Sequence, residues 1–175
     1  MNYNQVIFFC LAFVLLSFGL PKNIQKRVNK EVEKTFSTQA FELVQVKINP
    51  ELVKDLPSKF DGNNLFEIQE NNSLLGYAYI SSAPSKTAEF DYLVLFDKEW
   101  IIVKSKVLIY REEYGGEIGS KRWLKQFIGK NTSDELIYGD NIIAISGATI
   151  SVRSMTNAVN NVLKSIKILK HKNQL

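Results

Sequence analysis

The chain has few side chains that could carry out acid–base or nucleophilic chemistry by themselves. It contains one cysteine, Cys10, and one histidine, His171, whereas zinc sites, iron–sulfur clusters and bis-histidine haem each need several such ligands. His171 lies in a terminal Lys-His-Lys run, where a frayed tail would hold a catalytic base poorly. The Ser-x-x-Lys spacing of a lysine-activated serine does not occur. We therefore expect no catalytic residues and no metal site, and we expect a cofactor to supply any redox chemistry.

Two segments have unusual local chemistry. Residues 114–119 (Tyr-Gly-Gly-Glu-Ile-Gly) hold three glycines but lack the Lys-Ser/Thr of a phosphate-binding P-loop and the spacing of a dinucleotide fingerprint, so they predict a turn. Residues 146–149 (Ser-Gly-Ala-Thr) follow an apolar segment. They precede a helix expected at about 150–170, where apolar residues recur in steps of three and four. This second motif is therefore expected at the start of a helix.

The segments that must position these loops have the composition of strands. Runs rich in Val, Ile, Leu, Phe and Tyr predict strands at 41–48, 65–70, 74–81, 90–96 and 100–110. Short turns separate most of them, a helical piece follows Pro50, and a short helix is expected from Ser120, as N-cap, to Gly129. Because few long helical connections intervene, we expect an α+β fold: an antiparallel sheet with flanking helices and a long C-terminal helix.

The first twenty residues carry no charged side chain, and Val6–Leu20 is an almost unbroken apolar run. This pattern predicts an apolar helix at residues 1–21 that is either a signal peptide or a membrane anchor. Ser17 and Gly19 would suit cleavage, whereas the lack of a cation before the run argues against it. The cations between residues 22 and 30 would keep that flank in the cytoplasm under the positive-inside rule, so the orientation stays open.

Size and composition are those of one globular domain behind this segment. The 175 residues (20.0 kDa) are 45% hydrophobic and 23% charged. A net charge of +4 falls short of the charge and clustering of a dedicated nucleic-acid binder, so no nucleic-acid partner is expected. Residues 22–39 are expected to form a connecting helix with one apolar stripe, and residues 40–175 the domain itself.

The Ser-Gly-Ala-Thr motif before a C-terminal helix resembles the attachment segment of the FMN-binding domain family. That family includes the FMN-carrying subunits of the Rnf and sodium-pumping quinone oxidoreductase complexes. Gly76-Tyr77, the hairpin around Asp97, and residues 110–116 and 123–130 extend the similarity, so that it covers roughly residues 65–163. The resemblance implies FMN as the cofactor, joined through its phosphate to the hydroxyl of Thr149 as a phosphoester. It also implies a separate Mg-dependent flavin transferase that makes this bond from FAD outside the cytoplasm.

The resemblance and the local chemistry together give six candidate cofactor-binding residues. They are Ser146, Gly147, Ala148 and Thr149 of the motif, Ser151 either beside the phosphate or as a plain residue of the first helical turn, and Glu112 as a flavin-side or loop-fixing residue. If Ser146 is the N-cap, the free N–H groups of the first helical turn and the positive end of the helix dipole would offset the phosphate charge. Ile143 departs from the family pattern, which usually has Asp at that place, and this puts recognition by the transferase in question.

These observations predict an FMN-carrying electron-transfer protein rather than a self-sufficient enzyme. We expect it on the extracytoplasmic face of the cell membrane or exported to the periplasm, with redox partners there. Tyr110, Tyr114 and Trp123 are candidate neighbours of the flavin ring or plain packing residues. A second hypothesis, favoured by Ile143, is a noncovalent flavin-binding or interaction module of the same fold. A third, a flavin reductase, lacks a visible NAD(P)H-binding fingerprint.

Overall fold

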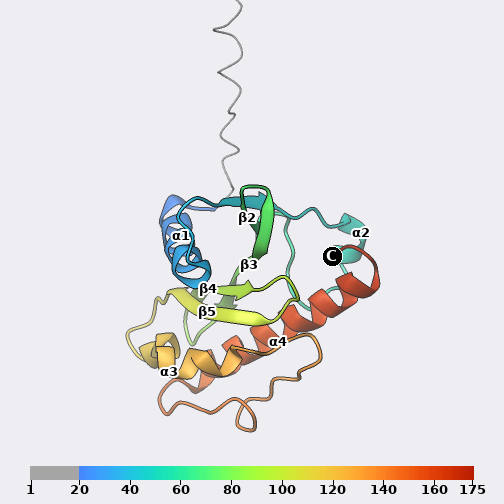
Figure 1. Ribbon diagram of the computed structural model, residues 1–175. Helices are drawn as coiled ribbons and strands as arrows, with labels where there is room; N and C mark the ends of the chain where they lie inside the picture. The colour runs from blue at the N-terminus through green and yellow to red at the C-terminus, as the bar shows by residue number, and fades with distance from the viewer. Residues whose placement is uncertain (1–19) are drawn as a thin grey trace, which may run out of the picture.

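Five strands form one antiparallel sheet in which each strand pairs with the next along the chain (Figure 1). The computed structural model describes residues 20–175, so the predicted signal or anchor helix falls almost wholly outside the described residues. The strands are β1 Glu42–Gln45, β2 Leu65–Glu70, β3 Ser73–Pro84, β4 Glu89–Phe96 and β5 Ile102–Ile109. The α+β fold class and the antiparallel sheet are therefore confirmed.

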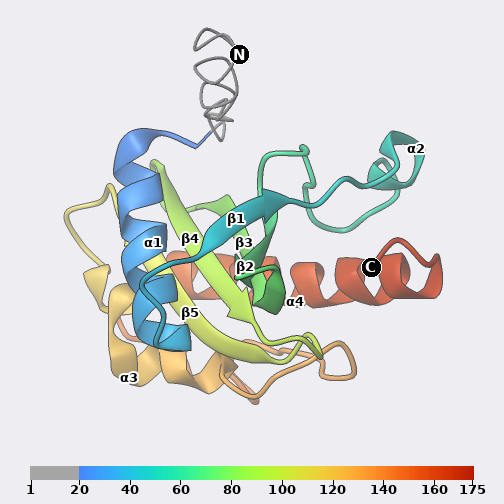
Figure 2. The same ribbon diagram turned by 45° about the horizontal axis from the view of Figure 1, so that its top comes forward.

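The sheet is covered on both faces because its central strands bury both sets of side chains. In β4, Tyr92 and Val94 belong to one hydrophobic cluster, whereas Leu93 and Leu95 between them belong to another. This alternation follows from the two-residue period of a strand. The first cluster includes the helix α4, Thr149–His171, and the second includes the helix α1, Lys22–Phe36. Figure 2 shows α1 in front of the strands and α4 behind them.

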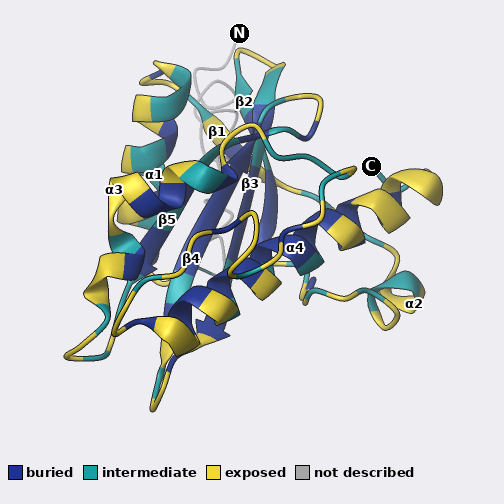
Figure 3. Ribbon diagram, turned by 90° about the horizontal axis from the view of Figure 1, so that it is seen from below, coloured by how far each residue is buried: buried dark blue, intermediate teal, exposed yellow. Residues whose placement is uncertain are grey.

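Helix α4 is the main support of the core. Eleven of its 23 residues are buried, and in Figure 3 buried segments alternate with exposed ones along the whole helix, which lies against the buried strands. The predicted long C-terminal helix is confirmed, with its start at Thr149. Within residues 20–175, none of the helices is both long and apolar enough to cross a membrane.

Helix α1 contacts the opposite face through a single narrow stripe. Its buried residues are Ile24, Val28 and Val32, one on each successive turn, as the sequence predicts. The Nη1 of Arg27 also donates a hydrogen bond of 2.9 Å to the carbonyl oxygen of Leu108 in β5. The other residues of the helix are exposed or half-buried, and all of them except Phe36 are polar.

The chain between β5 and α4 forms short helices and loops at one edge of the sheet. They are η3 Gly116–Gly119, α3 Lys121–Leu124 and η4 Lys125–Phe127, and another short helix, α2 Pro50–Val53, follows β1. Ser120 caps α3 as predicted, because its Oγ accepts a hydrogen bond of 3.3 Å from the Trp123 N–H. A buried hydrogen bond of 2.9 Å from Ser105 Oγ to the Leu124 carbonyl ties α3 to β5.

Candidate functional site

Thr149 is the first residue of α4, and its side chain is exposed. In the part of the chain that the structure describes, no hydrogen bond is made by its hydroxyl. Some other hydroxyls of the helix are engaged: Thr156 Oγ1 donates to the Val152 carbonyl at 2.8 Å, and Ser165 Oγ accepts from the Ser58 N–H at 2.9 Å. Thr149 therefore presents a hydroxyl that is free to react at the surface.

The helix begins without a side-chain cap. The N-cap is Ala148 and not Ser146, which corrects the expectation from the sequence. Gly147 adopts φ +81°, a left-handed conformation that turns the chain immediately before the helix and leaves Ser146 outside it. Within residues 20–175, the N–H groups of Thr149, Ile150 and Ser151 have no hydrogen-bond partner, and the first turn holds no acidic residue. The positive end of the helix is therefore open to an anion.

The motif itself is small and open to solvent. Ser146, Gly147 and Thr149 are exposed, whereas Ala148 is buried against the rest of the domain. No atom lies within 4 Å of the place where a side chain on Gly147 would begin. Another protein can therefore approach the backbone here, and the buried Ala148 keeps the motif fixed while it does so.

The glycine-rich loop packs directly against the motif. A Cβ on Gly115 would lie 3.4 Å from Cα of Ala148 and 2.8 Å from Oη of Tyr110, and Gly115 has φ +81°. Tyr110 Oη donates to the Tyr114 carbonyl at 3.0 Å and lies 3.0 Å from Ser151 Oγ. Because the tyrosine has one proton to give, Ser151 is the donor in the second contact. Tyr110 therefore joins the loop to the first turn of α4, a link that only the structure shows.

A second support holds the chain just before the motif. Trp123 Nε1 donates to the Ile143 carbonyl at 2.7 Å, and Gln126 Oε1 accepts from the Ile143 N–H at 2.8 Å. Gln126 Nε2 in turn donates to the Trp123 carbonyl at 3.0 Å. Both polar groups of the Ile143 backbone are thus held by α3 and η4, and the Ile143 side chain points outward with 68% of its surface exposed. No local sequence pattern indicates this supporting role for Gln126.

Glu112 fixes a hairpin and does not reach the motif. Its carboxylate accepts hydrogen bonds from Ser85 Oγ at 2.7 Å, from the N–H and hydroxyl of Thr87 at 2.6 and 2.9 Å, and from the Ala88 N–H at 3.2 Å. These bonds, that from Ser85 first, lower the pKa of Glu112 to about 2. Of the two roles considered for this residue, its contacts are those of a loop-fixing residue.

The predicted aromatic neighbours of the flavin ring differ in exposure. Trp123 is buried and packs edge-on against Phe127 with ring centroids 5.2 Å apart. Tyr114 is 82% exposed. One turn into α4, Arg153 lies 5.0 Å from the centroid of the Tyr138 ring, so the aromatic ring holds an exposed cation on the helix four residues after Thr149.

Residues 87–164 match the sequence model of the FMN-binding domain family. The match begins just before β4 and ends within α4. It therefore contains Glu112, the glycine-rich loop, the support at Ile143 and the Ser-Gly-Ala-Thr motif. Among curated proteins, none shows a significant match to the chain.

Proposed function

Because residues 87–164 match the FMN-binding domain family, as the motif predicts, we propose that the chain is an extracytoplasmic electron carrier with FMN joined to Thr149. In the attachment reaction, the Thr149 hydroxyl loses its proton and bonds to the FMN phosphorus of FAD while AMP leaves. The flavin transferase that the family resemblance implies would catalyse this step. When bound, FMN accepts and releases one or two electrons, so the chain need only hold the cofactor and expose it to partners.

The free hydroxyl of Thr149 is the observation that carries this proposal. A phosphoester needs an oxygen that a transferase can reach, and this oxygen is exposed and unpartnered at the start of α4. Ser151, two residues on, is buried and engaged with Tyr110, so it is a poor acceptor for the same reaction. Its contact with Tyr110 supports a positioning role for Ser151 and not a direct contact with the phosphate.

The surroundings of Thr149 suit a phosphodiester. The free N–H groups of the first turn of α4 provide donors and partial positive charge, and Arg153 adds a full charge on the next turn. The open space at Gly147 leaves room for the phosphate oxygens. Tyr114, Ile143 and Ile150, which are 82%, 68% and 51% exposed, border the motif and offer apolar surface to a flavin ring.

The openness of the site favours a covalent bond over reversible binding. Small-molecule sites that hold their ligand noncovalently bury most of its surface in a cleft. Two grooves on the described surface involve α1, β5 and the α3 region, and no residue from 144 to 151 lines either of them. A bond to Thr149 would retain the flavin without a deep pocket. The apolar run at residues 6–20, which predicts export or anchoring, supports a location outside the cytoplasm, where lost FMN is not replaced.

The decisive experiment compares hydroxyl variants of one position. We would express the full chain with a flavin transferase, denature it, and measure flavin fluorescence and the mass of the α4 peptide. Wild type and Thr149→Ser are expected to carry one FMN, because both keep a hydroxyl. Thr149→Val is nearly isosteric but cannot form the ester, and it should lose at least nine tenths of the signal while its circular dichroism stays unchanged.

Three other outcomes would contradict the proposal. Flavin that washes off the denatured wild type would favour the noncovalent module. Flavin retained by Thr149→Val would place the bond elsewhere. Steady NAD(P)H oxidation by the purified chain would favour a flavin reductase.

A further inference from the structure

A groove of about 890 Å³ lies away from the flavin motif, between α1, β5 and the short helices α3 and η4. Figures 1 and 2 show α1 and α3 on the same side of the molecule, flanking β5. The motif residues do not line it, and the proposed attachment of FMN makes no use of it.

Cations reach this groove from every wall. Helix α1 contributes Lys26, Arg27, Lys30 and Lys34, and β5 contributes two more lysines. The α3 region opposite adds another two. The groove therefore holds eight of the chain's 22 Lys and Arg but one of its 18 Asp and Glu. The other residues carry 14 cations against 17 anions, so the groove concentrates more than the whole positive excess of the protein.

The single acid of the groove neutralises little of this charge. Glu31 lies 3.6 Å from Nζ of Lys104 and 4.0 Å from Nζ of Lys106, so two lysines share one carboxylate. In the described part of the chain, the remaining lysines of the groove have no ion-pair partner: Lys26, Lys30, Lys34, Lys121 and Lys125. Like charges gathered without counter-charges repel one another, and an anionic ligand would relieve that repulsion.

The floor of the groove is apolar, which restricts the kind of anion that fits. Leu108 and Leu124 line it as buried residues, and the half-exposed Ile128 lies at its edge. A rim of cations over an apolar floor matches a ligand that is anionic at one end and apolar at the other. The headgroup and glycerol region of an anionic phospholipid has this character.

The chain also connects this groove to the apolar run that predicts a signal peptide or a membrane anchor. The apolar run ends at Leu20, and α1 begins at Lys22. Fifteen helical residues rise about 22 Å, so every cation on α1 stays within roughly that distance of the end of the run. If the run lies in a bilayer, the groove faces a high local concentration of headgroups. A soluble acidic protein would gain no such advantage.

We propose that the basic groove between α1, β5 and α3 binds the phosphate-bearing headgroups of anionic phospholipids. The inference rests on the membrane location in the proposed function, but not on the attachment of FMN. Each lysine near an anionic surface strengthens such binding by about fivefold at low salt, and the effect weakens as salt screens the charges.

The test uses the full chain in vesicles of phosphatidylcholine, with and without phosphatidylglycerol. An uncharged amine-reactive reagent labels lysines, and mass spectrometry gives the labelling rate of each. We expect Lys30, Lys121 and Lys125 to react about fivefold more slowly when phosphatidylglycerol is present. Lys167 and Lys170, exposed on α4, serve as internal controls whose rates should not change. High salt should abolish the difference.

A matched pair of variants separates the groove from general surface charge. Lys121→Glu with Lys125→Glu should remove most of the protection of Lys30, whereas Lys167→Glu with Lys170→Glu, an equal change of charge on α4, should leave it. All four side chains are exposed, so neither variant disturbs the core. The mass of the α4 peptide from the same samples reports on flavin attachment separately, so a failure of one proposal is distinguishable from a failure of the other.

Three results would overturn the inference. Equal labelling with and without phosphatidylglycerol would show that the groove does not bind these lipids. Equal protection by free pyrophosphate would show that it binds soluble phosphates. Protection in native membranes, but not in vesicles of lipid extracted from them, would assign the groove to an acidic protein partner.

Discussion

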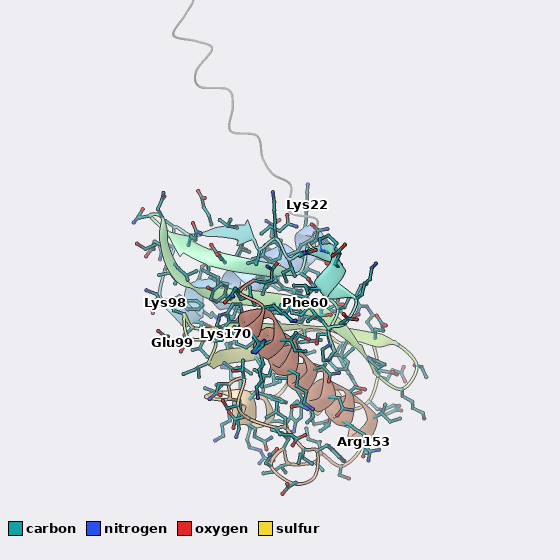
Figure 4. The ribbon with its side chains drawn as sticks, turned by 90° about the vertical axis from the view of Figure 1, so that its right-hand side faces the viewer. Lys22, Phe60, Lys98, Glu99, Arg153 and Lys170 are labelled. Carbon is teal, nitrogen blue, oxygen red and sulfur yellow. The ribbon has the colours of Figure 1, made fainter. Side chains whose placement is uncertain are left out.

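Helices α1 and α4 cover opposite faces of the same sheet, but they differ in how much of their surface is buried. Eleven of the 23 residues of α4 are buried, against three of the 15 residues of α1. Helix α4 is therefore part of the core, and its first residue, Thr149, is held in place by that packing. Helix α1 attaches through one stripe and leaves most of its surface to solvent. Figure 4 shows Lys22 and Arg153, near the starts of the two helices, at opposite ends of the molecule.

The two regions also attract anions by different means. At the motif, positive charge comes from backbone N–H groups fixed by the start of α4. In the groove, it comes from long lysine side chains on three walls. Fixed donors suit one phosphate held in one place, whereas flexible lysines suit headgroups that exchange. A difference in rigidity thus separates the proposed site of a permanently bound cofactor from the proposed site of exchanging lipid headgroups.

The largest effect on the free energy of unfolding is expected when an isoleucine is replaced by alanine in each of the two helices, which tests the difference in burial. Ile166→Ala in α4 should lower the free energy of unfolding by about 3–4 kcal/mol, because Ile166 is fully buried in the larger cluster. Ile24→Ala, in the first turn of α1, should cost about 1–2 kcal/mol, because a helix end can relax around the missing atoms. Urea unfolding followed by tryptophan fluorescence measures both. Equal losses would mean that α1 is as firmly packed as α4.

A smaller effect, set by pH, is expected at the hairpin between β3 and β4, which Glu112 holds. The pKa of Glu112 is lowered to about 2 in the folded chain, so its hydrogen bonds stabilise the fold fully above about pH 4.5 and lose that contribution as the pH falls toward 2. Glu112→Gln should therefore be less stable than wild type at pH 6, and the difference should shrink at pH 2.5. Unfolding midpoints at the two pH values measure it. A difference that does not change with pH would show that the charge of Glu112 is unimportant.

The sequence predicted those parts of the fold that depend on local chemistry. The boundaries of β2, the Ser120 cap and a helix beginning beside Thr149 all follow from patterns within a few residues. The predicted N-cap, Ser146, was wrong because the chain makes a left-handed turn at Gly147, so that the helix is capped by Ala148. A glycine in the sequence does not by itself reveal which backbone conformation it adopts.

The contacts that could not be predicted join residues far apart in the chain. The groove brings lysines of α1 together with lysines of the α3 region, about ninety residues later in the sequence. A mild net charge conceals that cluster, because the opposite charges lie elsewhere. Gln126 likewise holds the backbone of Ile143 although nothing near it in the sequence indicates a partner. Such pairings depend on how the sheet and its edges are folded, which local patterns do not specify.

The smallest expected effect on stability is at Ile143, on the α4 side of the comparison. Its backbone is held by Trp123 and Gln126 while its side chain is exposed. Ile143→Asp should therefore change the free energy of unfolding by no more than about 0.5 kcal/mol. The family resemblance implies an aspartate at this place, so the same variant should be flavinylated several-fold faster by a purified transferase, as followed by fluorescence of denatured samples over time.

Ile143→Asn is the matched control, because it has the size of aspartate without the charge. A faster reaction for aspartate alone would show that the transferase recognises a carboxylate held out by a rigid backbone. Equal acceleration by both variants would mean that removing an apolar side chain is enough. No acceleration in either would show that the motif, held by α3 and α4, already presents Thr149 as well as the enzyme requires, and that the isoleucine does not limit attachment.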